Sequence, residues 1–230
     1  MKRDITRFAW AAALALVSAT VDSAESRGGW QDEFALSKCK LLAAGRNPYF
    51  ILEPGYQIVL EDGGDKLVIT VLDRTRAIGG VTTRVVEERE WKGGKLREVS
   101  MNYFALCEGS NDVYYFGEDV DIFEDKKPVS HDGSWLAGTA GNRAGLIMPG
   151  SPKVGMKYYQ EVAPGVAMDR AEIVSVDEKC KTAAGTVAGC LKIRETSPLE
   201  PLASDVKYYA PGVGFVGDRS LKVVRHGVVK

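Results

Sequence analysis

Acidic side chains gather in one segment of the chain, directly after an apolar and aromatic run. The sequence VYYFG at 113–117 is followed by Glu118 and Asp119, and further carboxylates follow up to position 125. Carboxylates at such close spacing could surround Ca²⁺, which takes roughly six to eight oxygen ligands. The spacing differs from that of an EF-hand loop, so we expect a solvated acidic strand end and predict no metal site. Glu118 and Asp119 remain of interest, since a carboxylate in apolar surroundings needs a partner such as arginine.

A second set of candidate residues lies in and after a glycine-rich middle, residues 128–155. Trp135 and Arg143 lie within it, and Tyr159 and Glu161 follow it. We expect this middle to be irregular. A long loop beside a sheet is where the mouth or the lid of a pocket is expected.

The carboxylates of both segments are expected to act with an arginine or with one another. Glu161 and Asp169 could form an acid/base pair, although capping of loops and ion pairing with arginine are commoner roles. We expect Glu118 or Glu161 to be buried within salt-bridge reach of an arginine, first Arg143 and second Arg76. No residue is assigned a catalytic role. The residues predicted to bind a ligand are Tyr115, Glu118, Asp119, Trp135, Arg143, Tyr159 and Glu161.

Histidine is scarce, which restricts the chemistry open to the chain. His131 and His226 are the only two, and we expect a plain loop histidine at the first position and an exposed one at the second. The motifs of a nucleophile elbow, a zinc protease, a P-loop and a dinucleotide-binding fold do not occur in the sequence. A Ser-His-Asp triad and a multi-histidine metal centre are therefore not expected, and no cofactor is predicted.

The N-terminus has the pattern of a secretory signal peptide. Basic residues precede an uncharged apolar run at 8–20, and small residues follow it. The run is shorter than the roughly 20 residues that a membrane-spanning helix needs. We place the signal peptide at residues 1–24, with cleavage after Ala24 and Ala19 as the second choice. The chain is therefore expected to be exported, either to the periplasm or into the medium, and no membrane span is predicted.

The four cysteines predict two disulfides, because the number is even and the chain is expected in an oxidising compartment. Cys180 and Cys190 flank the sequence KTAAGTVAG, a hairpin connection, so they are expected to face each other across two strands. That pairing leaves Cys39 to bond with Cys107. Zinc is the competing use of cysteine, but closely spaced cysteine pairs of the CxxC kind do not occur.

The remaining sequence predicts strands rather than helices. Diglycine turns at 63–64, 79–80 and 93–94 separate segments that are rich in β-branched and aromatic residues and alternate between apolar and polar positions. Alternation bounded by diglycine is typical of β-hairpins. Further strand candidates continue to the C-terminus and bring the number to about ten. Strands this long favour a curled sheet, either an open half-barrel or a closed up-and-down barrel.

Length and charge indicate one domain. We expect an N-terminal polar segment at 25–47, with at most one short helix, and a single antiparallel β domain at 48–230. The net charge is only −1 over 230 residues, and charges of both signs are mixed along the chain. A basic stripe that would bind a polyphosphate backbone is not present, so nucleic acid is not a predicted partner. The oligomeric state does not follow from the sequence.

Several short motifs occur in order along most of the chain. They are NPYF at 47–50, VYYFGED at 113–119, GSW at 133–135, YYQE at 158–161 and KYYAPGVG at 207–214. In this order they resemble a family of uncharacterised exported bacterial all-β proteins. The resemblance implies an exported β protein, and because no activity is known for the family it implies no chemistry. Members usually have Trp-Tyr-Ala followed by Gln-Asp where this chain has YFALC at 103–107.

Three classes of function agree with these observations. The first is a non-catalytic binding protein of the cell envelope, because a curled sheet with an aromatic lining can hold a small apolar or amphipathic molecule. The second is an extracytoplasmic lyase or hydrolase that uses carboxylate and tyrosine side chains. The third is a structural or interaction protein whose sheet edges pair with a partner. A closed apolar cavity would favour the first class.

Overall fold

The protein is an all-β, antiparallel structure, as the alternating sequence pattern predicts. The computed structural model describes residues 29–182, 184–218 and 220–229, and the predicted signal peptide lies outside these ranges. The N-terminal polar segment, expected to hold at most one short helix, contributes a three-residue 3₁₀ turn at Leu36–Lys38. Within the described ranges, no helix is long and apolar enough to cross a membrane.

Five strands in the first half of the chain form an antiparallel meander. They are β4 (Tyr56–Asp62), β5 (Asp65–Ile78), β6 (Val81–Lys92), β7 (Lys95–Cys107) and β8 (Val113–Glu124). Gly79 and Gly80 both have positive φ, 55° and 82°, as do Gly93 and Gly94, 56° and 75°. Two-residue hairpin turns of this kind match the twist of the flanking strands, and glycine adopts them without strain. The predicted diglycine hairpins are therefore confirmed.

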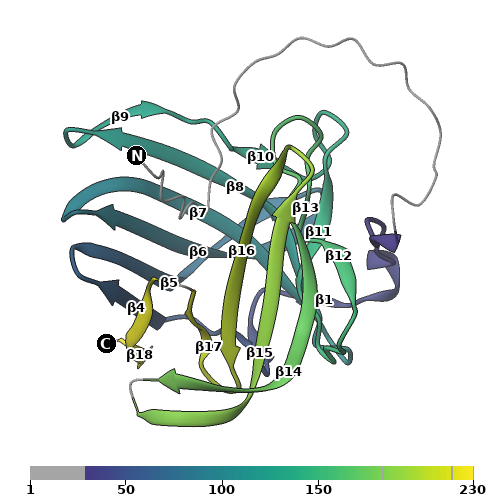
Figure 1. The fold of residues 1–230 in the computed structure, drawn as a ribbon. Helices are drawn as coiled ribbons and strands as arrows, with labels where there is room; N and C mark the ends of the chain where they lie inside the picture. The colour runs from purple at the N-terminus through teal and green to yellow at the C-terminus, as the bar shows by residue number, and fades with distance from the viewer. Residues whose placement is uncertain (1–28, 183, 219, 230) are drawn as a thin grey trace.

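The second half of the chain forms another meander that returns to the first. Its strands are β14 (Arg170–Thr182), β15 (Gly185–Ser197), β16 (Glu200–Ala210), β17 (Gly214–Gly217) and β18 (Lys222–Val228). Strand β18 pairs with β4, which joins the two halves into one sheet. In Figure 1 the strands β14–β16 cross the strands β5–β8 at a steep angle on the other side of the fold.

Short strands account for the difference between about ten expected strands and the larger number that the described residues form. They are β1 (Leu41–Leu42), β2 (Gly45–Asn47), β3 (Phe50–Leu52), β9 (Lys127–Ser130), β10 (Trp135–Leu136), β11 (Arg143–Met148), β12 (Lys157–Tyr159) and β13 (Glu161–Val162). The middle of the chain is thus less irregular than predicted. Strands β9, β10 and β11 all pair with β8. Glycines lie between these three strands and interrupt them, so each strand is short.

The sheet curls until its two ends nearly meet. The order of pairing runs from β12 through β14–β18 and β4–β8 to β11 and β13. Strands β12 and β13 therefore lie at opposite ends of the pairing order, yet only Gln160 separates them along the chain. The backbone N–H groups of Gln160 and Glu161 both reach the carbonyl oxygen of Asp169, at 2.7 and 3.2 Å. Residues 160 and 161 thus form the seam of a nearly closed barrel.

Apolar residues from both halves fill the inside of the curl, and two disulfides fasten its periphery. The buried side chains, among them Leu52, Leu60, Met148 and Ile193, belong to one cluster that spans the fold. Cys39 is bonded to Cys107 and Cys180 to Cys190, with Cα–Cα distances of 5.3 and 6.1 Å. Both predicted pairings are confirmed. The first ties the N-terminal segment to the end of β7, and the second joins β14 to β15.

Candidate functional site

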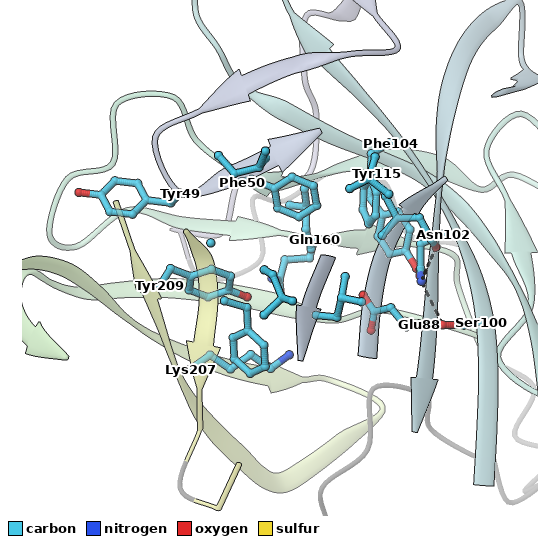
Figure 2. Close-up of a pocket in the computed structure, with 18 of the residues that line it drawn as sticks. Tyr49, Phe50, Glu88, Ser100, Asn102, Phe104, Tyr115, Gln160, Lys207 and Tyr209 are labelled. Atoms are coloured by element: carbon cyan, nitrogen blue, oxygen red, sulfur yellow. Dashed lines mark hydrogen bonds between the residues drawn. The ribbon is translucent and has the colours of Figure 1, made fainter. Parts of the chain in front are cut away.

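A cavity of about 90 Å³ lies inside the curled sheet, where the two halves face each other. Most of its wall is apolar and includes Phe50, Ile58, Ile69, Phe104, Ile147 and Phe215. Figure 2 shows that side chains from many strands surround this space. The volume is enough for a few water molecules or for the body of a small organic ligand.

One side of the cavity wall is acidic. Five carboxyl groups line it, and within the described residues Lys207 is the only lysine or arginine that lines it as well. The acidic residues are Glu88 on β6, Glu118 on β8, Glu161 on β13, Asp169 just before β14, and Glu195 on β15. Two of the five, Glu161 and Asp169, lie at the seam of the barrel. A cavity with both an apolar and an acidic part of its wall is amphipathic, and it suits a molecule that has an apolar and a polar part.

A bulge in β8 turns Tyr115 and Glu118 toward the cavity together. In a regular strand, residues three apart face opposite sides. Here Phe104 is opposite Tyr115 while Asn102 is opposite Glu118, so one extra residue is accommodated in β8. Gly117 makes the bulge possible, because its φ is 132° and an added Cβ would lie 2.3 Å from the carbonyl oxygen of Trp135.

The buried lysine is held by an acid and an amide. Lys207 forms an ion pair with Glu195, whose side chain is only 10 % exposed. The side-chain amide of Gln160 donates a hydrogen bond of 3.0 Å to the other carboxylate oxygen of Glu195. Burial lowers the pKa of Lys207, but the nearby carboxylates, Glu195 first, outweigh this effect and leave its pKa raised. Lys207 therefore stays charged and is committed to Glu195.

A buried hydrogen-bonded chain lies along β7 and β8. The hydroxyl of Tyr115 donates to the side-chain oxygen of Asn102, whose amide nitrogen donates to Ser100 at 3.0 Å (Figure 2). Tyr115 also shares a hydrogen bond with Glu118. Burial, followed by the charge of Glu118, holds the pKa of Tyr115 well above its ordinary value. The phenol thus stays neutral and acts as a hydrogen-bonding group.

The cavity carboxyl groups hold their protons to unusually high pH. Burial raises the pKa of Glu118 well above its ordinary value, with Glu98 and Glu88 adding to the effect, and it does the same for Glu161, with Asp169 and Glu118 adding. Burial also raises the pKa of Glu88 to about 7 and that of Asp169 to about 6, although Lys207 opposes both shifts. Near neutral pH the group of acids is therefore only partly ionised.

Three of the seven predicted binding residues, Tyr115, Glu118 and Glu161, line the cavity together. Both glutamates are buried, with 4 and 8 % of their surface exposed, as expected. Trp135 lies behind Tyr115, in an edge-on contact with 5.4 Å between ring centroids, and is itself buried. Of the aromatic and acidic residues at 113–119, Tyr115 and Glu118 therefore point into the cavity.

The other three predicted residues lie outside the cavity lining. Asp119 binds Arg76 at 2.5 Å on the outer side of the sheet, and Tyr159 packs against Trp30 with 6.3 Å between ring centroids. Arg143, expected to pair with Glu118 or Glu161, instead forms an ion pair of 3.0 Å with Asp32. The predicted arginine partner was therefore wrong. The cation that lines the cavity together with these carboxyl groups is Lys207.

Sequence reasoning did not single out Glu88, Glu195 or Lys207. Glu88 lies in the sequence EERE at 87–90, which has the composition of a solvated strand. Glu87 and Arg89 do pair with each other at 2.8 Å on one face, and alternation turns Glu88 to the other face, beside Val86. One face of β6 is apolar at Val86, and the other carries the pair of Glu87 and Arg89. Alternation along the strand would therefore have predicted that Glu88 lies on the same face as Val86.

Comparisons with known proteins add no relative: no protein-family model, no curated protein and no solved structure matches this chain. The fold and the cavity therefore define a class only, an antiparallel curled sheet, nearly closed, with an amphipathic interior cavity and two disulfides.

Proposed function

We propose that this chain is a binding protein that holds a small amphipathic molecule in the cavity of its curled sheet. The observation that carries the proposal is the composition of the cavity wall, which is aliphatic and aromatic on one side and acidic on the other. Binding sites for small molecules are mostly apolar with a few convergent polar groups. An apolar body would lie against Phe104 and Ile69, and a polar end would face the carboxyl groups.

The two alternatives receive less support from the geometry. A catalytic site was expected where Glu118 or Glu161 meets an arginine, whereas Arg76 and Arg143 pair with other carboxylates. A protein that recruits partners through sheet edges needs long free edges. Here the sheet ends in β12 and β13, of three and two residues, which Gln160 links directly.

We further propose that the protein works outside the cytoplasm. Two disulfides are compatible with an oxidising compartment. The pattern of residues 1–24 supports export through cleavage of a signal peptide. N-terminal sequencing of the protein from the periplasmic fraction tests this point, and an intact Met1 in the mature protein would contradict it.

The binding proposal is tested by filling the cavity. Ile69 lines the cavity and is partly exposed to it, so Ile69→Trp should occupy the space with little strain elsewhere. The matched control is Val224→Trp, because Val224 is 47 % exposed on β18 and does not line the cavity. Ile147→Trp, from a different strand, provides a second filled cavity if the first variant folds poorly.

Two readouts decide the outcome. Native mass spectrometry of protein from the periplasmic extract should show a retained small molecule on the wild type and on Val224→Trp, and none on the filled variants. Nuclear magnetic resonance titrations with 2-phenylethanol and 2-phenylethylamine should perturb cavity residues such as Phe104 in the same two proteins only. Absence of both effects from the wild type, or their persistence in both filled variants, would refute the binding proposal.

A further inference from the structure

The cavity contains more acid than the chain can neutralise. Five carboxyl groups line it against one lysine, and that lysine is paired with Glu195. Among the described cavity residues, Lys207 also acts electrostatically on Glu88, Glu161 and Asp169, but its charge does not outweigh the effect of burial on their pKa values. Buried like charges in close proximity are unfavourable unless protonated or paired.

Glu161 is the cavity acid whose carboxylate most clearly lacks a hydrogen-bond donor from the protein. It is 8 % exposed and lines the cavity from the seam of the barrel. Its backbone is fixed, since Ala144 of β11 lies opposite it and its N–H reaches Asp169. Among the described residues, however, no side chain forms a hydrogen bond or an ion pair with its carboxylate. A carboxylate that lines a cavity, is held rigidly and receives no hydrogen bond from a protein side chain keeps its acceptor sites open for a molecule inside the cavity.

We propose that the ligand of this cavity is a small amphipathic amine, whose ammonium group binds Glu161 and whose apolar body lies against the aromatic wall. This inference rests on the proposed binding function and names the chemical class of its ligand. An ammonium has three hydrogen-bond donors and no acceptor. It can therefore supply donors to Glu161 and to a neighbouring acid such as Asp169 at the same time.

The energetics favour an amine because the protein has already removed its carboxylates from water. Binding then adds the desolvation of the ammonium and the loss of the proton that burial keeps on Glu161, and the short-range attraction between the ammonium and the ionised carboxylate offsets both costs. The cavity volume of about 90 Å³ limits the ligand to a small molecule.

A bare metal ion fits this site less well than an organic cation. Within the described ranges, no three acidic, histidine or cysteine side chains lie close enough to hold a metal together. The carboxyl groups come instead from five separate elements along the acidic side of the wall. A ligand with an extended apolar body uses the remaining wall, which a metal ion would leave empty.

The experiment compares two probes that differ in charge but hardly in shape. 2-Phenylethylamine and 2-phenylethanol are titrated into the wild-type protein at pH 7.5 by isothermal calorimetry, where the amine is fully charged. We expect the amine to bind at least tenfold more tightly than the alcohol. In Glu161→Gln this preference should fall below about threefold, because the variant keeps the shape of the side chain but cannot ionise to form an ion pair with the ammonium. Glu88→Gln, at another position of the acidic wall on β6, should reduce the preference by a smaller factor.

A matched control and the other outcomes make the test decisive. Glu124→Gln makes the same chemical change at an exposed position on β8, and it should retain the full preference for the amine. Equal or tighter binding of the alcohol to the wild type would overturn the amine inference while leaving the binding function in place. Binding of neither probe would overturn both. Persistence of the preference in both Glu161→Gln and Glu88→Gln would overturn the assignment of the ammonium to this acidic wall.

Discussion

Replacing Glu88 by glutamine should stabilise the protein above neutral pH and leave it almost unchanged in acid. Glu88 lies on the acidic side of the cavity on β6, and its burial raises its pKa from 4.5 to about 7. Glutamine has nearly the same size and shape, so packing around Val86 and Ser100 is preserved. The substitution therefore removes the cost of ionising an acid inside the cavity and little else.

The magnitude follows from the difference in pKa between the folded and the unfolded chain. Because the folded pKa of Glu88 is the higher one, the wild type is most stable below the unfolded pKa and loses stability as the pH rises toward 7. The shift is about 2.5 units, and at about 1.4 kcal/mol per unit the loss is about 3 kcal/mol. The glutamine variant cannot ionise and so avoids this loss. Its advantage should be near zero at pH 4 and about 3 kcal/mol at pH 8.

Urea unfolding at pH 4 and pH 8, with the disulfides intact and tryptophan fluorescence as the probe, measures this difference. Glu87→Gln is the matched control, because Glu87 lies on the opposite face of β6 in a surface ion pair with Arg89. Such a pair contributes less than about 1 kcal/mol, so the control should change little at either pH. A Glu88→Gln variant with the same advantage at both pH values, or one less stable than the wild type at pH 8, would refute the reasoning.

The disulfides and the seam of the barrel give two further predictions. Cys39→Ser should lower the free energy of unfolding by about 4 kcal/mol and Cys180→Ser by about 3 kcal/mol, because the first bond spans 68 residues and the second 10. Urea unfolding in oxidising buffer measures both losses, and the reverse order would contradict this prediction. Gly145→Ala should cost more than about 2 kcal/mol and abolish probe binding, because its Cβ would lie 2.1 Å from the carbonyl oxygen of Gln160. Gly141→Ala, with open space around the added Cβ, should lose only about 1 kcal/mol to backbone strain and keep binding, and equal losses in the two alanine variants would contradict the steric argument.

Much of the fold could be predicted because local signals and tertiary structure agree in the long hairpins. In β4–β7 the diglycine turns set which residues pair beside each turn and alternation sets the faces, so neither depends on distant contacts. The short strands β9–β11 could not be predicted in this way. They form only because β8 offers them an edge, and their glycines and prolines carry no strand signal of their own.

The candidate site was predictable to the extent that it lies within single strands. The sequence VYYFGED marked Tyr115 and Glu118 because acids directly after an apolar run are unusual, and both residues line the cavity. The pairing of Lys207 with Glu195 depends on how β15 and β16 align across the sheet, which spacing along the chain does not fix. Arg143 was assigned by proximity in sequence, whereas the N-terminal segment brings Asp32 to it instead.

Further acidic side chains lie on the sheet beyond the cavity wall. They bear on why so many acidic residues face the inside of the fold. Glu90 on β6 lies directly opposite Glu98 on β7, and Glu98 is only 8 % exposed. Like charges directly opposite each other in a sheet are destabilising, and Glu98 further raises the pKa of Glu118. A core selected for stability alone would favour apolar residues over buried acids, even where one acid has a cation nearby, as Glu90 has in Lys92 at 3.7 Å. The stability that Glu88→Gln should recover measures what one such acid costs, and the preference for an amine measures what the acidic wall contributes to binding.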